Sequence, residues 1–551
     1  MNNVFKAIQL VFRLDKKSFV INYGIFTLES LSFVASIWAM QMVLEQIARY
    51  LQSETSAKTV IAYLLFFTLI KILIYVLRSY MGYYCEYYDL SLRQRIEKTT
   101  QDKEIAPICY EDKEFLDLLS QAQIGKNRIV AITNAYIDIV FMYGLNFLFL
   151  AIYLFYLNKT LILILALAIA LQILHGRFER KVEKELEEKI KNIRRKRDYF
   201  VELFAKRESV KEIYALGNHD FFRNKLGEIL DKLYESGEKF YRKLLNNDLR
   251  MGIGRAITFS VCFALIFWKR NELTLSEYAV LFVTMNSILS LMEEGFYTRL
   301  KRVNSDIVYL DAYFKFMESD FEAEKMEFGD EIRLKNVSFR YPNAESYALQ
   351  NIDLCIRPDE KIGVVGVNGS GKSTLSKLIL QMYEPSEGEI QSLPSSAVFQ
   401  DFVKYELSTL ENIQISDFEK EVEASLIDEI AFGESQDADY NKVLSKQFSD
   451  KDISQGQWQK LAILRGLHKN SDFLVFDEPT WAIDPIVEKK VFDFIYEKSK
   501  RGMLVVTHRL SLIKKMDRII VLDKGRLIGY DTHDNLLKSN EHYKMLWEAN
   551  L

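Results

Sequence analysis

Hydrophobic residues fall into long runs before about residue 295 and into short runs after it. The longest run, 139–174, is interrupted only by three polar residues at 158–160. Because about 20 mostly apolar residues cross the hydrocarbon core of a bilayer, this run predicts two membrane spans joined by a tight turn. Runs at 19–44 and 59–85 predict an earlier pair of spans.

A weaker pair of apolar runs, 253–268 and 278–292, completes a set of six predicted spans. An even number of spans places both ends of this part of the chain on the same side of the membrane. The alternative is six buried helices of a large soluble protein. The 139–174 run is too long and too apolar for that alternative.

Long charged stretches separate the second span from the third and the fourth span from the fifth. The later stretch, 177–250, alternates Glu with Lys and Arg, which is typical of solvated helices with ion pairs between residues i and i+4. The other connections are short, so we expect helices that project far from one face of the bilayer. The basic residues of the N-terminus and of these stretches place that face in the cytoplasm.

The composition excludes some partners and modifications. A net charge of −4 over 551 residues provides no global attraction to nucleic acid. The four cysteines form neither a CxxC motif nor a metal-ligand spacing, and we expect reduced thiols. No small-residue cleavage site follows the first apolar run, so we expect no cleavable signal peptide and a multi-pass protein of the inner (cytoplasmic) membrane.

Charged residues within the apolar runs include Glu29 in the first span and Lys71 in the second. Intramembrane charges are costly and usually face a cavity or an opposite charge. The alternative is that Glu29 lies near one end of its span and that Lys71 reaches the interface through its long aliphatic stem. The sequence leaves both interpretations open.

A glycine-rich loop lies within the sequence KIGVVGVNGSGKST at 361–374. An apolar strand precedes it and helix formers follow, which is the context of the phosphate-binding motif GxxxxGK[ST]. We expect Lys372 to reach the β- and γ-phosphates of ATP and the Ser373 hydroxyl to hold Mg²⁺. The predicted nucleotide-binding residues of this loop are Gly366, Asn368, Gly369, Ser370, Gly371, Lys372, Ser373 and Thr374.

A second strand ends on two carboxylates. The apolar residues 473–476 predict a buried parallel strand, and Asp477 and Glu478 follow directly. Ligands of α/β sheets gather at the carboxyl ends of the strands. We therefore expect Asp477 at Mg²⁺ or at a water bound to it, and Glu478 polarising the water that attacks ATP.

Together with the residues between and around them, these motifs resemble the ATP-binding-cassette (ABC) superfamily over essentially the whole chain. The resemblance implies that Tyr341 in FRYP stacks on adenine and that His508 in VVTHRL contacts the γ-phosphate. It implies that Gln400 in VFQD contacts the metal and links the nucleotide site to the membrane domain. It also implies that Asp484 in WAIDP belongs to a loop that crosses a dimer interface.

The segment ISQGQ, 453–457, occupies the place of the family signature LSGGQ. In that family the signature of one subunit clamps the γ-phosphate bound by the other, which implies this role for Ser454, Gly456 and Gln457. Gln455 replaces the first signature glycine and adds bulk where glycine allows close backbone approach. Slower turnover, or a heterodimer in which this chain supplies the weaker signature, would follow. The intact catalytic glutamate and histidine argue against an inactive ATPase.

Six spans ahead of one cassette resemble the half-transporter of the exporter class. YEDKEFLD at 110–117 resembles a segment common in bacterial exporters, and RESVKEI at 207–213 resembles a stretch that docks on the opposing cassette. The alternative is that both are ordinary solvated helix. FVKYELSTLENI after Gln400 and FSDKDISQGQWQK around the signature resemble exporters of lantibiotics and other antimicrobial peptides. About 18 residues precede the first span, so we expect no protease domain there.

The predicted architecture is multidomain, with an all-α transmembrane domain of six helices at 1–320 and an α/β P-loop NTPase cassette at 328–551. The predicted function is export of a peptide across the membrane, driven by ATP with Mg²⁺, through alternating access of a homodimer or heterodimer. Export of a lipid or small drug, or a slowly hydrolysing ATP-gated sensor or channel, are the alternatives. The spans argue against a soluble ATPase of the same superfamily.

Overall fold

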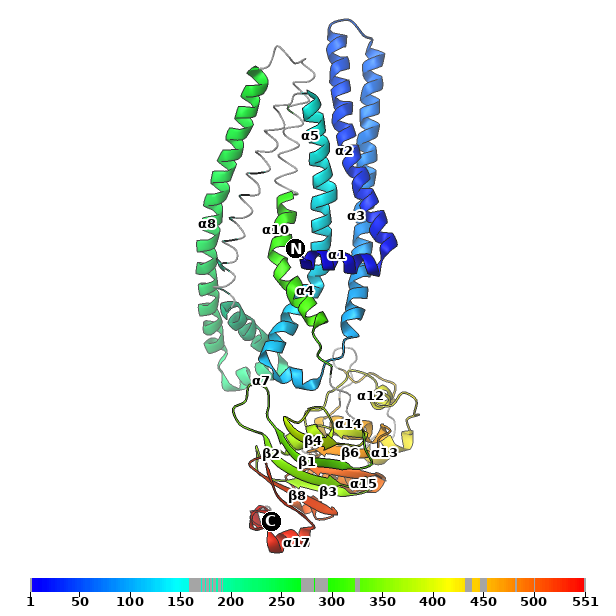
Figure 1. The fold of residues 1–551 in the computed structure, drawn as a ribbon, viewed down its shortest axis with the longest axis vertical. Coiled ribbons are helices and arrows are strands. Elements are labelled where there is room, and N and C mark those ends of the chain that lie inside the picture. The colour runs from blue at the N-terminus through cyan, green and yellow to red at the C-terminus, as the bar shows by residue number, and fades with distance from the viewer. Residues whose placement is uncertain are drawn as a thin grey trace. The chain divides into compact units, whose positions relative to one another are not determined.

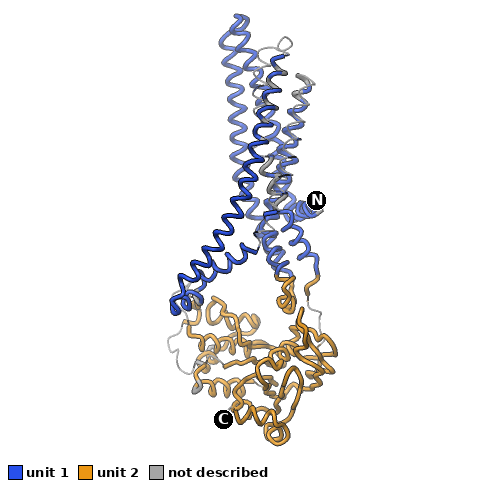
Figure 2. The backbone as a smooth tube through the Cα atoms, turned by 90° about the vertical axis from the view of Figure 1, so that its left-hand side faces the viewer, with its two compact units in different colours: residues 1–103, 117–319 blue, residues 104–116, 320–551 orange. Residues whose placement is uncertain are grey.

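The protein is represented by a computed structural model, which falls into two compact units (Figure 2). The helical unit contains residues 1–103 and 117–319, and the cassette unit contains residues 104–116 and 320–551. The structure describes residues 2–157, 192–268, 296–322, 328–431, 439–445, 453–480, 483–499 and 501–549, with isolated positions between 170 and 190 and residue 282.

Long helices form the described part of the helical unit (Figure 1). They are α1 (Asn2–Leu14), α2 (Lys16–Leu51), α3 (Ala57–Gln101), α4 (Lys113–Ile137), the π-helix η2 (Asp138–Gly144), α5 (Leu145–Leu157), α7 (Arg207–Leu216), α8 (His219–Trp268) and α10 (Tyr297–Glu318). The first four residues of α4 belong to the cassette unit.

Side chains fix the start of α2 and of α3. Asp15 accepts a hydrogen bond from the backbone N–H of Ser18 at 3.0 Å. Ser56 accepts one from the backbone N–H of Thr59 at 3.4 Å. Between these helices Ser53 takes a φ of 63°, in the left-handed region that reverses a chain within few residues. The two helices therefore form an antiparallel hairpin (Figure 1).

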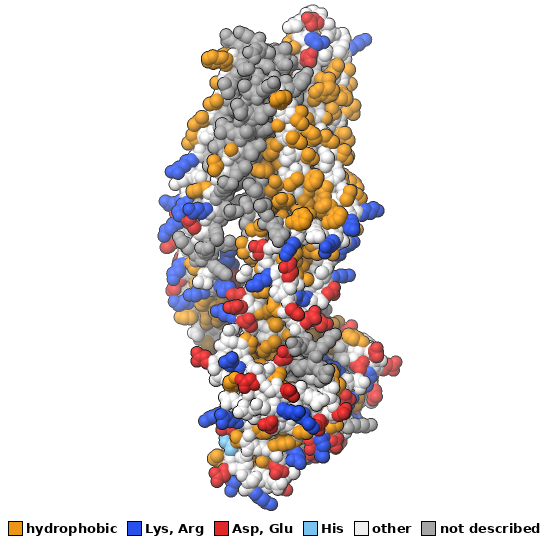
Figure 3. Space-filling model, viewed as in Figure 1, with side chains coloured by type: hydrophobic (Ala, Val, Ile, Leu, Met, Phe, Trp, Pro, Cys, Tyr) orange, Lys and Arg blue, Asp and Glu red, His pale blue; other side chains and the backbone are white. Residues whose placement is uncertain are grey.

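Three helical stretches in the described residues are long and apolar enough to cross a membrane: Lys16–Leu51, Ala57–Gln101 and Lys113–Ile152. They contain the first three predicted spans. The fourth and sixth predicted spans lie almost entirely outside the described residues, and the fifth lies in the C-terminal part of α8. Apolar side chains cover the visible face of α2 and α3 (Figure 3).

A packed core joins α1, α3, α4 and α10 in the helical unit. Leu92 of α3, Ile129 of α4 and Leu310 of α10 are fully buried in it. At Gly125 the backbone of α4 approaches α10 so closely that a Cβ would lie 2.1 Å from the carbonyl oxygen of Tyr309. Only glycine allows this approach, so the contact between these helices depends on that position.

The cassette unit contains two sheets. The three-stranded sheet has the order β2-β1-β4, and the six-stranded sheet has the order β5-β6-β7-β3-β8-β9. The strands are β1 (Ile332–Phe339), β2 (Leu349–Ile356), β3 (Lys361–Val365), β4 (Glu387–Gln391), β5 (Ser395–Val398), β6 (Phe473–Asp477), β7 (Gly502–Val506), β8 (Arg518–Asp523) and β9 (Arg526–Asp531). In the larger sheet, neighbouring strands in the order β5-β6-β7-β3-β8 pair in parallel, and β9 pairs antiparallel with β8.

Helices complete the cassette unit on both faces of the six-stranded sheet. They are η1 (Pro107–Glu111), α11 (Lys372–Ile379), α12 (Thr409–Gln414), α13 (Ala424–Ala431), α14 (Gln455–His468), α15 (Pro485–Lys498), α16 (Leu510–Ile513), α17 (His533–Ser539) and α18 (Glu541–Ala549). Residues of α11 share one core with both sheets, and residues of α13 to α16 share a second core with the opposite face of the larger sheet. The larger sheet is thus buried on both faces, as a parallel sheet requires.

The segment 104–116 belongs to the cassette unit although it connects α3 to α4. Tyr383 donates a hydrogen bond from its hydroxyl to Glu111 Oε1 at 2.6 Å, and Asn343 donates one to Asp112 at 3.2 Å. The rings of Phe115 and Phe321 meet edge to face at 4.9 Å. These contacts lie within the cassette unit and hold the connecting segment on the nucleotide-binding fold.

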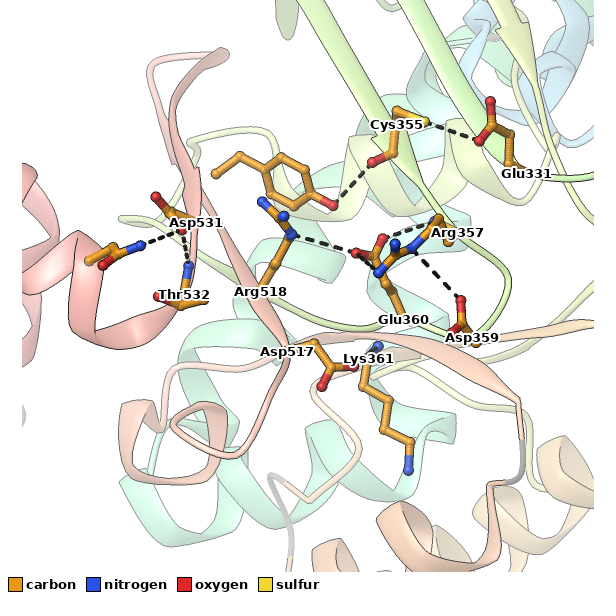
Figure 4. Close-up of polar contacts among 12 residues, drawn as sticks. Glu331, Cys355, Arg357, Asp359, Glu360, Lys361, Asp517, Arg518, Asp531 and Thr532 are labelled. Atoms are coloured by element: carbon orange, nitrogen blue, oxygen red, sulfur yellow. Dashed lines mark hydrogen bonds and ion pairs between the residues drawn. The ribbon is translucent and has the colours of Figure 1, made fainter.

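A buried carboxylate stabilises the turn that carries the chain from β2 to β3. Glu360 accepts hydrogen bonds from the backbone N–H of Arg357 at 2.9 Å and from its guanidinium at 3.2 Å. Arg518 of β8 approaches the same carboxylate at 3.5 Å, so Glu360 lies between two guanidinium groups (Figure 4). The side chain of Glu360 is 8 % exposed, and both of its oxygens have partners.

Replacing Glu360 with Ala should lower the stability of the cassette unit by about 2–3 kcal/mol, because it strands a backbone N–H and two guanidinium groups. For a domain of this size that loss lowers the melting temperature by roughly 4–10 °C. The control is Asp359→Ala, because the side chain of Asp359 is 80 % exposed and its ion pair with Arg357 is long, at 3.9 Å. Calorimetry of the full chain in detergent measures both; equal shifts for the two variants would contradict this account.

Candidate nucleotide site

One edge of the six-stranded sheet gathers the predicted nucleotide residues. Strand β3 pairs in parallel with β7, and β7 pairs in parallel with β6, so all three strands end at the same edge. The phosphate loop follows β3, Asp477 ends β6, and His508 lies two residues beyond β7. Segments far apart in the sequence meet there, as ligand-binding residues of α/β sheets do.

The phosphate loop folds around glycines that leave room for its backbone. A Cβ at Gly366 would lie 2.3 Å from the carbonyl oxygen of Leu522 and 2.4 Å from Ser370 Oγ. Gly371 has a φ of 102°, and a Cβ there would lie 2.7 Å from Leu349 Cδ2. Because α11 begins directly after Gly371, its unpaired N–H groups and its positive end face the loop. This arrangement is a cradle for phosphate.

The side chains of the loop differ in exposure. Asn368, Gly369 and Ser373 are exposed, whereas Ser370, Lys372 and Thr374 are buried. Ser370 Oγ is buried without a hydrogen-bond partner among the described residues. A polar atom left in that position inside a phosphate loop is suited to a hydrogen bond with a bound ligand.

Lys372 lies inside the loop, with its side chain largely buried. Its Nζ donates hydrogen bonds to the carbonyl oxygens of Gly366 at 3.0 Å and Val367 at 3.1 Å. Burial lowers the pKa of this ammonium, and the negative charges of Glu478 and Asp477 oppose that shift. The cation is therefore held close to the two carboxylates that end β6.

Asp477 is 9 % exposed at the end of β6. Burial raises the pKa of this carboxyl group, and a hydrogen bond from Ser373 opposes the shift. The hydroxyl and the carboxylate belong to different elements, α11 and β6, and meet at the mouth of the loop. Hard oxygen donors of this kind fit Mg²⁺, which usually binds proteins through one or two such groups plus phosphates and water.

Glu478 pairs with His508 beside the loop. Glu478 Oε1 lies 2.8 Å from His508 Nε2, and the backbone N–H of Glu478 donates to the carbonyl of Val506 at 2.9 Å. Glu478 has a φ of 48°, a conformation that is uncommon outside glycine and concentrated at functional sites. Both side chains keep solvent access, at 19 % and 48 % exposed. A carboxylate oriented by an imidazole is suited to act as a base toward water.

Tyr341 lies next to the start of α11. Its hydroxyl is 3.1 Å from Thr374 Oγ1, and its ring packs edge-on against Phe339 at 5.1 Å and Tyr383 at 5.8 Å. A pocket of about 920 Å³ opens beside it and is lined in part by Pro342 and Pro385. The ring is therefore fixed at its edge. The pocket is lined further by Ala106, Ile108, Cys109 and residues 320–322 and by no residue of the phosphate loop, so stacking of Tyr341 on adenine stays a prediction.

Gln400 and Asp484 are exposed residues close to strand and helix ends. Gln400 follows β5, which pairs in parallel with β6, so it lies at the same edge of the sheet as Asp477. Asp484 directly precedes α15, and its carbonyl accepts the backbone N–H of Glu488 at 2.8 Å. Both positions are compatible with the expectations above, and their roles stay predictions.

The signature segment caps helix α14. Ser454 Oγ accepts the backbone N–H of Gln457 at 3.3 Å, and Gln457 Oε1 accepts the backbone N–H of Ser454 at 2.8 Å. This reciprocal capping box presents the Ser454 hydroxyl at the positive end of a helix. Gly456 is half-buried, while Ser454 and Gln457 are exposed. Gln455 occupies the first helical position with an ordinary helical backbone, so its effect is one of bulk and not of strain.

The sequence analysis missed a buried network behind His508. Glu488 of α15 is 3 % exposed, accepts the Thr480 hydroxyl at 2.6 Å and forms an ion pair with Arg509. Arg509 is the neighbour of His508 in the chain, so this network anchors the histidine. The sequence contained only a weak signal for this network, because Thr480 and Arg509 are merely adjacent to the motifs DEP and VVTH and Glu488 belongs to no motif.

The residues present fit ATP and Mg²⁺. The glycine cradle and the α11 N-terminus suit phosphate, Ser373 with Asp477 supplies oxygen donors for the metal, and Tyr341 suits the base. Contacts and charges bring Lys372, Asp477 and Glu478 together with His508, and their binding and catalytic roles stay predictions. The signature residues are on a separate helix.

Comparison with known proteins is consistent with this site. Residues 349–481 match the family described as ABC transporter. The chain is 30% identical over 375 residues to the subtilin transport ATP-binding protein SpaT of Bacillus subtilis, covering 62% of this chain and 60% of that protein. It is 28% identical over 383 residues to the nisin transport ATP-binding protein NisT of Lactococcus lactis, covering 63% and 64%. These matches span less than two thirds of the length of each relative.

The fold is also similar to a solved structure. A bacterial Atm1-family ABC exporter with ATP bound superposes with a TM-score of 0.78, covering 98% of this chain and 99% of that one at 16% sequence identity. An ATP-dependent lipid A-core flippase of Alkalilimnicola ehrlichii is 37% identical over 237 residues, covering 39% of this chain and 40% of that protein. The predicted fold class, a helical membrane-type domain followed by an α/β nucleotide-binding domain, is confirmed.

Replacing Asp477 with Asn should raise the melting temperature measured without nucleotide, because it removes a charge that is less favourable in the folded state. The folded state raises the pKa of Asp477 above its ordinary value of 3.8, so its ionised form is less favourable when folded than when unfolded. The gain should therefore increase as pH rises from about 4 through the raised pKa and stay constant above it. Binding of Mg²⁺-ATP should weaken in the same variant. A lower melting temperature at pH 7 would contradict the desolvation argument.

Replacing Glu488 with Gln should lower the rate of ATP hydrolysis by roughly 5- to 20-fold with little change in the KM for ATP, because the anchor of Arg509 and His508 loosens while the phosphate loop stays intact. The matched control on the same helix is Asp493→Asn, whose carboxylate forms an exposed pair with Lys515 at 2.6 Å. Exposed pairs contribute little, so this control should hydrolyse ATP at the unaltered rate. Equal losses in the two variants would rule out the anchoring role.

Proposed function

We propose that this chain, which carries an ABC transporter domain on an exporter-type fold, is an ATP-driven half-transporter that exports a peptide across the cytoplasmic membrane. The observation that carries the proposal is the union of two features in one chain. Lys372, Asp477, Glu478 and His508 converge beside a phosphate cradle. Three described helices ahead of that site are long and apolar enough to span a bilayer.

The side chains divide the work of hydrolysis. The loop N–H groups and Lys372 bind the phosphates, and Tyr341 holds the base. Ser373 and Asp477, with Gln400, hold Mg²⁺, which when bound neutralises charge on the phosphates. Glu478 orients the attacking water and takes its proton at Oε1, and His508, 2.8 Å away, keeps that carboxylate in place. A positioned base of this kind contributes roughly 10²- to 10⁴-fold to a rate.

The working unit in this proposal is a dimer. The phosphate loop of one chain and the Ser454 hydroxyl of its partner enclose each ATP, so that ATP binds the closed dimer more tightly than the open one. That difference in affinity drives the change of access across the membrane. Gln455 makes this signature bulkier than the family pattern, which favours slow turnover in a homodimer or pairing with a different half-transporter.

A peptide is the cargo that the relatives support. The matches to the subtilin and nisin transport proteins cover 62% and 63% of this chain, more than the cassette unit can supply, so they include part of the helical unit. The match to the lipid A-core flippase covers only 39% of the chain. Lipid or small-drug export therefore ranks second, and a slow ATP-gated sensor or channel ranks third.

The test is ATP-dependent uptake into inside-out proteoliposomes, with a labelled peptide, a labelled phospholipid and a small dye as probes. The unaltered protein should accumulate the peptide. Glu478→Gln should bind ATP but lose roughly 10²- to 10⁴-fold in hydrolysis and lose peptide uptake, whereas Asp493→Asn should keep both. Peptide flux that persists in Glu478→Gln would leave the sensor or channel as the function, and uptake of phospholipid or dye alone would replace the cargo.

A further inference from the structure

Charged side chains meet within the apolar part of the helical unit. Arg78 Nε of α3 donates a hydrogen bond to Glu29 of α2 at 2.7 Å. Arg299 Nε of α10 donates one to Asp138 of η2 at 2.7 Å. Helix α2 packs against both α3 and η2, and η2 packs against α10. The two pairs therefore form one group, the four-charge cluster (Glu29, Arg78, Asp138 and Arg299).

The cluster lies toward one end of the spans. At about 1.5 Å per helical residue, Arg78 lies roughly 28 Å from the Thr59 end of its apolar run and roughly 10 Å from the other end at Cys85. Asp138 lies roughly 28 Å from Leu157, the last described residue of α5. Since the hydrocarbon core is about 30 Å thick, the cluster lies near the boundary of the core on the side remote from the 52–56 loop.

The backbone at the cluster departs from a regular helix. Asp138 begins the π-helical stretch that runs to Gly144. The Ser30 hydroxyl lies 3.3 Å from the carbonyl oxygens of both Phe141 and Met142, which ties α2 to this irregular turn. Short π-helical insertions are rare in proteins as a whole, but those that occur are often found at functional sites.

Neither ion pair is saturated. The side chains of Glu29 and Asp138 are 3 % and 8 % exposed, and each uses one oxygen for its arginine. Glu29 Oε2 and Asp138 Oδ1 are buried without a hydrogen-bond partner among the described residues. Burying an ionised carboxylate with half of its acceptors unused costs stability that apolar side chains would not cost. Charges kept at such a cost inside a membrane domain indicate a functional site.

The accessible part of the cluster is positive. The side chains of Arg78 and Arg299 are 53 % and 38 % exposed, while both carboxylates are buried. Lys71, also exposed, lies two helical turns from Arg78 on the same face of α3. Among the described residues, each guanidinium contacts its carboxylate through Nε, which leaves its terminal N–H groups for another acceptor. Planar forks of N–H donors match the two oxygens of a carboxylate.

We propose that the four-charge cluster recognises a carboxylate of the exported peptide. Arg78 and Arg299 donate to the ligand, and Glu29 and Asp138 are positioning residues that hold the two guanidinium groups. This inference rests on the proposed function and adds to it a required feature of the cargo, an accessible anionic group.

The experiment uses the full-length protein in nanodiscs of phosphatidylcholine, without ATP. The probes are two fluorescent peptides with the same apolar residues, one with Asp side chains and a free C-terminal carboxylate, the other with Asn and a C-terminal amide. The carboxylate peptide should bind roughly 10- to 100-fold more tightly, the effect of charge-assisted hydrogen bonds. Arg78→Gln and Arg299→Gln should each remove most of that preference.

Control variants separate recognition from folding. Arg49→Gln removes the same side chain from another carboxylate pair of α2, where Arg49 lies 2.6 Å from Glu45, and should keep the full preference. Arg78→Lys and Arg299→Lys keep the charge beside the buried carboxylate but lose the fork, so they should fold and show an intermediate preference. Recovery of the preference in the order Arg, Lys, Gln supports recognition by the guanidinium.

Several outcomes would overturn the inference. The first is equal binding of the two peptides by the unaltered protein, and the second is a loss of preference in Arg49→Gln as large as in Arg78→Gln. The third is that the Arg78 and Arg299 variants lose their dimeric state while peptide affinity is kept. The fourth is displacement of the peptide by phosphatidylglycerol added to the nanodiscs. The rate of ATP hydrolysis by the unaltered protein in the same nanodiscs separates the two levels. If the protein hydrolyses ATP but binds the two peptides equally, only the carboxylate site is contradicted. If it does not hydrolyse ATP, the proposed function itself is contradicted.

Discussion

The parallel pairing of β6, β7 and β3 is the constraint on which the nucleotide site depends. It brings the ends of three strands to one edge, where the phosphate loop, the carboxylates of Asp477 and Glu478, and His508 meet. A slip of one residue in that pairing would turn the side chains to the opposite face of the sheet. Burial of α11 between the two sheets holds the phosphate loop on that edge, so the packing that forms the core also positions the site.

Contacts within the cassette unit link the nucleotide site to the segment that connects α3 to α4. Tyr341 packs against Tyr383, whose hydroxyl donates to Glu111 in the segment between α3 and α4. Lys377 of α11 donates to the same tyrosine hydroxyl at 3.0 Å. The ring expected to hold the base is thus one residue away from a segment covalently joined to two long helices, and aromatic and charged contacts rigidify that short path.

Buried carboxylates have two different fates in this protein. Glu360 has partners on both oxygens and stabilises a turn between sheets. Glu29 and Asp138 have one arginine each and an unused oxygen. Stability alone accounts for the first arrangement but not for the second, because a half-satisfied buried charge is costly. The contrast separates a structural ion pair from one that serves recognition.

The sequence by itself indicated the order of domains, the first spans and the phosphate loop, and it predicted a catalytic pair, because apolar run length and short motifs depend on local chemistry. Only the tertiary structure decided which charges meet. It paired Glu29 with Arg78, placed Glu488 behind His508, and joined residues 104–116 to the cassette unit. These partners lie on different elements, and pairing between elements depends on packing that no local pattern encodes.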